Sequence, residues 1–591
     1  MCGIFAVVND KTNQAAQTVL AGLKKLEYRG YDSWGIAIKP LHGQSLAVEK
    51  HVGKIGGAET NLPAGTIAFG HTRWATHGGV IDKNAHPHLD CRKKIAVVHN
   101  GIVENYAEFK KELKRKNHRF VSETDTEVIA HLIEEISKTK PINQAVFQAF
   151  NQLIGSNAIA VLDLQSESII ACRNGSPLVV GLDDKNHQYF LGSDVPAFLK
   201  YTNKVHFLAD GEGVIITKNG VKIFDSKLEK EKKLIRETLN WKLEDADKGG
   251  YPHFLIKEIM EQKITIPKTA NINEEEIKKI TMMIKKGYQV VLTGCGSAFH
   301  CALGGKYFFA DVGIEAQAFG AYEFLPFVKF FNKKTIVMAI SQSGETADTL
   351  LAAREAKKQK AHIVAVVNAR GSTLERLADT ALPVGAGPEI AVVSTKAFTS
   401  QLATLYLISQ AIIGKYEEGK KEIRNLEQLI KKWLNSKLIK KIAHLAKLLI
   451  DKEHLFLIGK HLNYPAALEF ALKIKETSYL HAEAFTAGEL KHGVIALIQK
   501  GTPCLVLASN DQIKREILSS SAQLKARGGF IIGIAPYEAE EFDFLIKTPD
   551  LGNLTIFPNI IVGQLLGYYL GIGRGADPDK PRNLAKSVTV K

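Results

Sequence analysis

The sequence predicts an α/β protein whose second half contains two doubly wound parallel-sheet domains. In the segments 291–297 and 456–462 an apolar run leads into a glycine, Gly294 or Gly459. A second pair of apolar runs occurs at 337–341 and 505–509. The members of these pairs are 165 and 168 residues apart, which indicates an internal repeat. Each run is continuously apolar and leads into a helix, as is typical of strands that are buried on both faces of a parallel sheet.

Length and composition are those of a globular protein with several cores. The 591 residues are enough for about three or four domains. The chain is 45% hydrophobic and 24% charged, and its net charge is +15. The lysines alternate with glutamates, as in 227–248, and do not gather into basic runs with interleaved aromatic residues. We therefore expect no nucleic-acid partner and a surface that favours anionic metabolites.

The cysteine pattern favours a reducing compartment. The six cysteines, at 2, 91, 172, 295, 301 and 504, include no Cys-x-x-Cys pair, so we expect neither disulfides nor a metal site. His86, His88 and Cys91 are too sparse a ligand set, and we expect a loop there. The N-terminus shows no signal segment, and the apolar run 556–573 is interrupted by polar residues and proline. We therefore expect a cytoplasmic protein without a membrane span.

The first residues offer a nucleophile. Removal of Met1 would leave Cys2 with a thiol and a free α-amine on one residue. An α-amine has a pKa of about 8, so near neutral pH it can accept the thiol proton directly or through a water molecule. A Met-Cys start alone is more often structural, and the candidate role of Cys2 depends on the segments that follow.

Three further segments carry polar groups that suit a small ligand. The segment 70–78 concentrates hydrogen-bonding side chains between glycines. In 97–102 an apolar strand runs into Asn100 and Gly101, where a side-chain amide and a backbone N–H can point at one oxygen. The segment 122–127 precedes an apolar run and predicts helix capping together with ligand binding.

Five segments in order, 2–4, 28–33, 71–78, 99–101 and 122–127, resemble the glutaminase domain of class II, N-terminal-nucleophile amidotransferases. The resemblance implies an αββα sandwich over 1–225 that acts on L-glutamine. The implied roles are as follows: Cys2 attacks the side-chain amide, Asn100 and the Gly101 N–H form the oxyanion hole, Arg73 binds the carboxylate, Asp125 binds the α-amine, and Trp74, Thr76 and His77 line the pocket. Trp34 departs from the small residue expected after Tyr-Asp-Ser.

Domain boundaries follow from composition. A charge-rich stretch, 226–250, ends in Lys-Gly-Gly and is typical of a linker. We expect the glutaminase domain at 1–225, two sheet domains at 251–430 and 431–577, and a polar C-terminal tail at 578–591.

A phosphate site is expected in the first sheet domain. In doubly wound sheets ligands bind at the carboxyl ends of strands, and the segment 341–346 lies there with two serines, a glutamine and a threonine. Together with the free N–H groups of a helix start, these side chains can hold a phosphate without a lysine. The chain has no Gly-x4-Gly-Lys-Ser/Thr loop and no Gly-x-Gly-x-x-Gly loop, so we expect neither ATP nor a dinucleotide.

The second half resembles the tandem sugar-isomerase (SIS) domains of the glutamine–fructose-6-phosphate aminotransferase family. The matching segments are 295–297, 341–346, 393–398, 473–476, 481–484, 488–493 and 581–590. The resemblance implies that the sugar phosphate is bound by Ser297, Ser341, Gln342, Ser343, Thr346, Val393, Ser394 and Lys473. Ala298 departs from the hydroxyl residue expected beside the sugar.

The two resemblances together imply transfer of the amide nitrogen of L-glutamine to fructose 6-phosphate in hexosamine biosynthesis, giving glucosamine 6-phosphate and glutamate. Ammonia would pass internally through a gate near Trp74. At the sugar, His492 would open the ring, Lys586 would form a Schiff base at C2, and Glu476 would move a proton between C1 and C2. No metal or organic cofactor is required. We expect a homodimer in which His492 completes the sugar site of the neighbouring subunit.

Other classes are less well matched. Asparagine synthetase shares the front half but requires a Ser-Gly-Gly-x-Asp-Ser loop, which the chain lacks, and a phosphoribosyl amidotransferase requires a diphosphate loop that we do not find. A non-enzymatic sugar-phosphate sensor should lack Glu476, His492 and Lys586 together, and all three residues are present.

Overall fold

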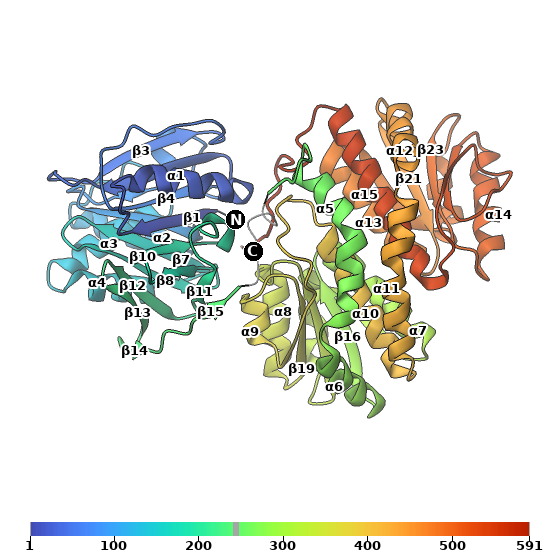
Figure 1. Cartoon of the computed structure of the whole chain (residues 1–591), viewed down its shortest axis with the longest axis horizontal. Coiled ribbons are helices and arrows are strands. Elements are labelled where there is room, and N and C mark those ends of the chain that lie inside the picture. The colour runs from blue at the N-terminus through green and yellow to red at the C-terminus, as the bar shows by residue number, and fades with distance from the viewer. Residues whose placement is uncertain (1, 240–246, 590–591) are drawn as a thin grey trace. The chain divides into compact units, whose positions relative to one another are not determined.

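The computed structural model describes residues 2–239 and 247–589 (Figure 1). The chain forms two compact units, Met1–Ala246 with Ala585–Lys591, and Asp247–Leu584. Residues 240–246 of the predicted linker lie outside the described residues. The earlier part of that stretch contains two short strands, at 231–232 and 237–238, which pair with strands of the first unit.

Two antiparallel sheets form the centre of the first unit. The eight-stranded sheet has the order β15-β11-β9-β10-β1-β4-β2-β3, and the seven-stranded sheet has the order β14-β13-β12-β8-β7-β6-β5. The strands of the first sheet are β1 (Gly3–Val8), β2 (Ser33–Lys39), β3 (Ala47–Val52), β4 (Ile67–Arg73), β9 (Val179–Asp183), β10 (Gln188–Gly192), β11 (Lys204–Phe207) and β15 (Glu237–Thr238). Those of the second are β5 (His88–Leu89), β6 (Ile95–Gly101), β7 (Asn157–Asp163), β8 (Ser168–Asn174), β12 (Glu212–Thr217), β13 (Gly220–Asp225) and β14 (Glu231–Lys232).

Side-chain alternation along these strands produces four layers. The helices of this unit are α1 (Ala15–Leu26), α2 (Tyr106–Arg115), α3 (Glu127–Ser137) and α4 (Ile142–Gln152). Ile4 of β1 and Val98 of β6 belong to one core between the two sheets. Val97 faces the opposite side and packs in a second core with α3 and α4. On the outer face of the first sheet, Phe5 lies so close to Gly22 of α1 that a Cβ there would be 2.2 Å from its ring. The predicted αββα sandwich is confirmed.

The second unit contains two five-stranded parallel sheets with the same topology. Their orders are β17-β16-β18-β19-β20 and β22-β21-β23-β24-β25. The strands are β16 (Gln289–Gly294), β17 (Ala316–Gly320), β18 (Thr335–Ser341), β19 (His362–Val367) and β20 (Thr380–Pro383), then β21 (His454–Gly459), β22 (His481–Thr486), β23 (Pro503–Leu507), β24 (Phe530–Ala535) and β25 (Phe544–Lys547). The shared order confirms both the internal repeat and the doubly wound class, which has the order 2-1-3-4-5.

Helices cover both faces of these sheets. They are α5 (Phe254–Lys268), α6 (Glu274–Lys285), α7 (Ser297–Asp311), α8 (Ala347–Lys358), α9 (Thr373–Leu377), α10 (Lys396–Ile412), α11 (Tyr416–Trp433), α12 (Ser436–Leu449), α13 (Asn463–Ser478), α14 (Lys514–Lys525) and α15 (Ile556–Gly573). In β16, Leu292 and Val291 lie in two different cores, so the strand is buried on both faces as predicted. Within the described residues one helical segment, Gly552–Gly573, is long and apolar enough to cross a membrane, but 83% of its apolar window is buried inside the protein.

Candidate active site

The thiol of Cys2 lies against the loop that follows β4. The backbone N–H of Trp74 donates to Cys2 Sγ at 3.3 Å, and Sγ lies 3.5 Å from the Trp74 carbonyl oxygen. The register of β1 against β4 pairs Gly3 with Thr72, which sets Cys2 beside the end of β4. A Cβ at Gly3 would lie 2.7 Å from Thr72 Oγ1, so this close approach requires glycine. Burial raises the pKa of the Cys2 thiol, and the Trp74 N–H and Arg73 oppose that effect.

An amide donor is fixed next to Cys2. Asn100, at the end of β6, donates through Nδ2 to the carbonyl oxygen of Cys2 at 3.1 Å and to Ser193 Oγ at 2.9 Å. The following residue, Gly101, has φ +138°, and a Cβ there would lie 2.0 Å from the Ser156 carbonyl oxygen. Asn100 therefore contacts Cys2, and the turn that follows it has a backbone conformation that requires glycine at position 101.

His71 orients this amide. Its Nε2 lies 3.0 Å from Asn100 Oδ1 and 3.0 Å from the His99 carbonyl oxygen. Burial lowers the pKa of His71 to about 3, so the ring is neutral and its Nε2–H donates to these acceptors. With Oδ1 of Asn100 occupied in this way, its NH₂ group faces Cys2. Neither His71 nor Ser193 was among the predicted site residues.

Charged groups of both signs surround the thiol. Arg73 is buried at the end of β4 and donates to the carbonyl oxygens of His77, of Gly78 at 3.2 Å and of Gly79 at 3.3 Å. Burial lowers the pKa of Arg73, and the charges of Cys2, Asp32 and Asp125 oppose that effect. Asp125 is buried in the loop before α3, where its Oδ2 accepts from the Val103 N–H at 2.7 Å. The structure thus brings Cys2, Arg73 and Asp125 together.

The remaining predicted pocket residues lie on the loop after β4. Thr76 is exposed, Trp74 is half-buried, and the half-buried ring of His77 meets Tyr106 edge-on at 5.7 Å. Asp32 Oδ2 accepts from the Ala75 N–H at 2.8 Å and thereby ties this loop to the 28–33 turn.

The 28–33 turn also contacts Cys2, through its backbone carbonyl group. Arg29 donates to the Cys2 carbonyl oxygen at 3.3 Å and pairs with Asp194 at 3.1 Å. The Tyr28 hydroxyl donates to the same carboxylate at 2.6 Å. Trp34, which departed from the expected small residue, is buried in β2 and stacks on His51 at 4.5 Å.

The serine-rich loop 341–346 lies at the topological switch point of the first parallel sheet. It joins β18 to α8, and the connections from β16 and β18 lead to opposite sides of the sheet. Ser341 Oγ accepts from the Gly344 N–H at 3.0 Å and lies 3.3 Å from Thr346 Oγ1, and Ser343 Oγ accepts from the Glu345 N–H at 3.2 Å. The backbone carbonyl of Gln342 accepts from Asn368 and Ala369. These bonds hold the hydroxyl groups in a tight loop at the predicted place.

Lys473 joins the two parallel-sheet repeats. It lies on α13 and is 1% exposed. Its Nζ donates to Ser297 Oγ at 3.1 Å and to the Ser394 carbonyl oxygen at 3.2 Å, and both of these partners belong to the first repeat. The same Nζ lies 2.6 Å from Glu476 Oε2 and 3.3 Å from Glu469 Oε1. Four predicted site residues thus converge, with the buried Val393 adjacent to Ser394.

The carboxylates of this cluster differ in their environment. Burial raises the pKa of Glu476, and Lys473 opposes that effect. Glu469 is fully buried and pairs with His300 Nδ1 at 2.8 Å. The pKa of Glu469 is lowered, because Lys473 and His300 outweigh its burial. His300 and Glu469 were not among the predicted residues.

His492 and Lys586, the other two predicted catalytic residues, lie in the short helix after β22 and in the C-terminal tail. His492 is exposed in the short helix Glu489–His492, and the contacts of the described residues do not join it to Lys473 or Glu476. Lys586 is half-buried and belongs to the first unit, whereas Glu476 belongs to the second. The preceding part of the tail is anchored near α13, where the Arg582 N–H donates to the Tyr479 hydroxyl at 2.8 Å.

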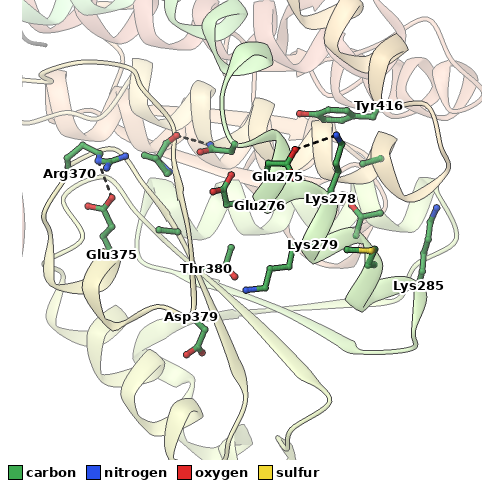
Figure 2. Close-up of a pocket in the computed structure, with 16 residues that line it drawn as sticks. Glu275, Glu276, Lys278, Lys279, Lys285, Arg370, Glu375, Asp379, Thr380 and Tyr416 are labelled. Carbon is green, nitrogen blue, oxygen red and sulfur yellow. Dashed lines mark hydrogen bonds and ion pairs between the residues drawn. The ribbon is translucent and has the colours of Figure 1, made fainter.

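A separate cavity of about 1090 Å³ lies on the first parallel-sheet repeat, between α6 and β20. Figure 2 shows that its walls carry charged side chains of both signs, including the pair of Arg370 with Glu375 at 3.1 Å. The predicted sugar-phosphate residues are not among those that line it within the described chain. The cavity is therefore distinct from the Lys473 cluster.

Comparisons with known proteins agree with this two-part organisation. Residues 71–200 match the glutamine amidotransferase domain family, and residues 282–411 and 448–540 match the SIS domain family. The glutamine–fructose-6-phosphate aminotransferase (isomerizing) of Thermococcus kodakarensis is 42% identical over 616 aligned residues, and that of Pyrococcus horikoshii is 41% identical over 610, with complete coverage of both chains in each case.

A solved structure also matches the second half. The C-terminal domain of glucosamine-fructose-6-phosphate aminotransferase from Francisella tularensis is 31% identical, with a TM-score of 0.51, and the match covers 57% of this chain and 99% of that one. Full-length identity above 40% to several relatives is decisive. This chain belongs to the glutamine–fructose-6-phosphate aminotransferase (isomerizing) family.

Proposed function

We propose that this chain transfers the amide nitrogen of L-glutamine to fructose 6-phosphate and isomerises the product to glucosamine 6-phosphate, with release of glutamate. The observation that carries the proposal is the presence in one chain of two sites, Cys2 beside Asn100 and Lys473 beside Ser297 and Glu476. The names of the full-length relatives support the same reaction.

In the glutaminase step the thiolate of Cys2 attacks the side-chain amide carbon of glutamine. The α-amine of the mature N-terminus takes the thiol proton and passes it to the leaving ammonia. The tetrahedral oxyanion accepts from Asn100 Nδ2 and the Gly101 N–H. Arg73 and Asp125 bind the carboxylate and the α-amine of the substrate, and their opposite charges near Cys2 support this orientation. Water then cleaves the thioester and releases glutamate.

In the sugar step His492 opens the ring, and the amine of Lys586 condenses with the C2 ketone and releases water. Ammonia, delivered without exchange with bulk water, displaces Lys586 from C2. Glu476 removes a proton from C1 and returns one to C2, which converts the ketose imine into the amino aldose. The raised pKa of Glu476 suits a group that both takes and returns a proton near neutral pH.

The sugar phosphate would bind at the first repeat. The hydroxyl groups of Ser341, Ser343 and Thr346, the Gln342 amide and the start of α8 offer donors to a phosphate. Ser297, Val393, Ser394 and Lys473 would contact the sugar from the neighbouring side. We further propose a cytoplasmic homodimer that binds neither membrane nor nucleic acid. The burial of the apolar helix supports the absence of a membrane span.

The test is a coupled assay. The protein is incubated with L-glutamine and fructose 6-phosphate, and glutamate and glucosamine 6-phosphate are measured in the same tube. Equal amounts of both products are expected, as is continued synthesis in the Cys2→Ala variant when an ammonium salt replaces glutamine. A sugar-phosphate sensor would bind fructose 6-phosphate but give no glucosamine 6-phosphate, and that result would refute the proposal.

A further inference from the structure

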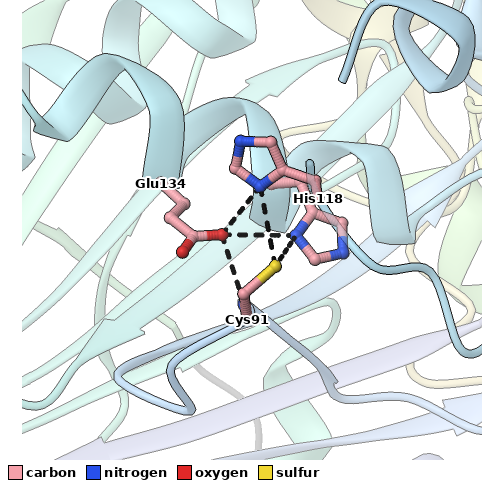
Figure 3. Close-up of side chains that lie close together, drawn as sticks. Cys91, His118 and Glu134 are labelled. Atoms are coloured by element: carbon pink, nitrogen blue, oxygen red, sulfur yellow. Dashed lines mark hydrogen bonds and ion pairs between the residues drawn. The ribbon is translucent and has the colours of Figure 1, made fainter. Parts of the chain in front are cut away.

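Four potential metal ligands from separate segments converge in the first unit. Cys91 lies in the turn between β5 and β6, His118 in the loop after α2, and His131 and Glu134 on α3. One ligand atom of each lies within 4.8 Å of all the others. Figure 3 shows the Cys91 sulfur, a ring nitrogen of His118 and a carboxylate oxygen of Glu134 directed at a common point. We infer a metal site here, although the cysteine and histidine spacings in the sequence predicted none.

Three of the four spacings are close to those of a tetrahedral zinc site, and the fourth, between His118 and Glu134, is that of a hydrogen bond which the ion would replace. Cys91 Sγ lies 3.7 Å from His118 Nδ1 and 3.6 Å from His131 Nδ1. Glu134 Oε2 lies 2.9 Å from His118 Nδ1 and 3.4 Å from His131 Nδ1. With Zn–S of about 2.3 Å and Zn–N and Zn–O of about 2.0–2.1 Å, tetrahedral angles place sulfur and nitrogen about 3.5 Å apart and nitrogen and oxygen about 3.3 Å apart.

The outer nitrogens of both rings face carboxylates. His118 Nε2 lies 3.0 Å from Glu135 Oε2, and His131 Nε2 lies 3.6 Å from Glu127 Oε1. A histidine that binds a metal through one nitrogen usually presents the other to such a carboxylate, which fixes the tautomer and the ring orientation. The Glu135 carboxylate therefore favours a His118 ring whose Nδ1 lone pair points at the common centre, and Glu127 lies on the outer side of His131 without a hydrogen bond to it.

Burial and charge suit a structural ion. The side chains of His118, His131 and Glu134 are 4%, 1% and 10% exposed, whereas Cys91 is exposed and gives a route for the ion to enter. A thiolate and a carboxylate together balance the charge of a divalent ion. A thiolate with two imidazoles selects zinc over magnesium or calcium. We propose that Cys91, His118, His131 and Glu134 bind one Zn²⁺ ion with all four positions filled by protein.

Such an ion would connect the segments that lead to the glutaminase site. The Cys91 turn leads into β6, which ends at Asn100 and Gly101. Glu127, behind His131, accepts from the N–H groups of Val121 at 2.8 Å and Ser122 at 2.7 Å, so it holds the loop that carries Asp125. The ion would act by stabilising this arrangement, because its four ligands leave no position for a substrate.

The test uses the full-length protein. It is purified from zinc-supplemented cells, dialysed without chelator and assayed for metal content by mass spectrometry. About one zinc ion per chain is expected in the wild type, with loss of at least nine-tenths of it in Cys91→Ser and His131→Ala. The matched controls are Cys504→Ser, which changes another cysteine, and His206→Ala, which changes another buried histidine that lies 3.8 Å from a glutamate, Glu212. Both control variants should keep the ion.

A second readout does not depend on the stability of the variants. Wild-type protein stripped with a chelator is titrated with Co²⁺, and the visible bands of tetrahedral cobalt and a thiolate charge-transfer band should saturate at one equivalent. Zinc well below one equivalent together with no cobalt spectrum would overturn the proposal, as would retention of zinc by Cys91→Ser. In either case the four side chains form only a network of hydrogen bonds and ion pairs. Neither readout uses enzymatic activity, so the result is independent of the proposed function.

Discussion

Lys473 Nζ, on a side chain that is 1% exposed, lies 2.6 Å from Oε2 of the half-buried Glu476, three residues further along α13. The lysine also faces Glu469 at 3.3 Å, so one ammonium group stabilises two carboxylates. The proposed proton-transferring group therefore has an ionisation state that depends directly on Lys473.

Replacing this lysine should change both stability and pH dependence. Burial raises the pKa of Glu476 and Lys473 opposes it, so Lys473→Met should raise this pKa further. A base with a higher pKa is protonated at higher pH, and the acidic limb of the kcat profile for glucosamine 6-phosphate synthesis should move upward. Loss of the buried partner should also destabilise the second unit by about 3–5 kcal/mol. Lys475→Met, on the exposed face of α13, is the control, and equal pH profiles for both variants would contradict the assignment.

The amide of Asn100 should dominate the glutaminase rate. Asn100→Ala removes one donor from the proposed oxyanion hole and should lower the kcat for glutamine hydrolysis about 10²- to 10³-fold, with little change in ammonia-dependent synthesis. Asn151→Ala, which removes a comparable side-chain amide bonded to the Ser226 carbonyl oxygen, should leave both rates unchanged. An unaltered hydrolysis rate in Asn100→Ala would place the oxyanion elsewhere.

The buried imidazole of His71 should make its surroundings sensitive to acid. Its pKa is lowered by burial to about 3, whereas an unfolded histidine has a pKa of about 6.5. Between these values the unfolded chain binds more protons, so stability rises with pH and is lost as the pH falls from 6.5 toward 3, by up to about 1.4 kcal/mol per pH unit.

The variant His71→Gln tests this effect, because glutamine can still donate to Asn100 but does not titrate. Hydrogen exchange of β6 peptides between pH 6 and 4.5 should give a smaller loss of opening free energy in the variant than in the wild type. His42→Gln, at an exposed position, should behave as the wild type does. A wild-type slope that survives in His71→Gln would assign the acid sensitivity to other groups.

His492 should act on a neighbouring subunit. The residue is exposed and is not joined to the Lys473 cluster by the contacts of the described chain, which agrees with the expectation that it completes the site of a partner. Mixing inactive His492→Ala and Glu476→Ala proteins should then restore part of the synthase activity, because some mixed dimers hold one intact site. The control is each protein mixed with itself, and no recovery after verified subunit exchange would indicate that each site is built from one chain.

Lys586 should form a covalent adduct with the sugar. Borohydride added with fructose 6-phosphate would reduce the proposed Schiff base and leave a hexitol phosphate on the C-terminal peptide, which mass spectrometry detects. Lys586→Arg keeps the positive charge but should lose the adduct and nearly all synthesis, whereas Lys580→Arg in the same tail should keep both. Full activity in Lys586→Arg would reduce the tail to a structural role.

Much of the fold was predictable because buried parallel strands have a simple signature. The glycine-ended apolar runs near Gly294 and Gly459 correctly predicted two sheets of one topology. The sequence motifs also indicated Cys2, Asn100 and Arg73, and the structure places Asn100 and Arg73 close to Cys2.

Residues that act through long-range contacts were not predictable in this way. Ser193 and His71 reach Asn100 from the opposite sheet, and a lone serine or histidine in an apolar segment carries no local signal. The Cys91 cluster joins segments up to 43 residues apart, and only His131 and Glu134, three residues apart on one helix, form a local pattern. The short strand β15 was missed because its two residues, Glu237 and Thr238, are polar and exposed.

Two hydrogen bonds, from Lys473 of the second repeat to Ser297 and Ser394 of the first, constrain how the two duplicated domains can evolve. Duplicated domains can usually be separated, exchanged or lost, because each retains its own core. Here the second copy supplies a buried cation that bonds to two serines of the first, so neither copy can be inherited alone without losing these bonds. The two copies also share one hydrophobic core, in which Leu292 of the first packs in the same cluster as Leu457 of the second, so a sugar phosphate bound there would add to an association that the core already provides.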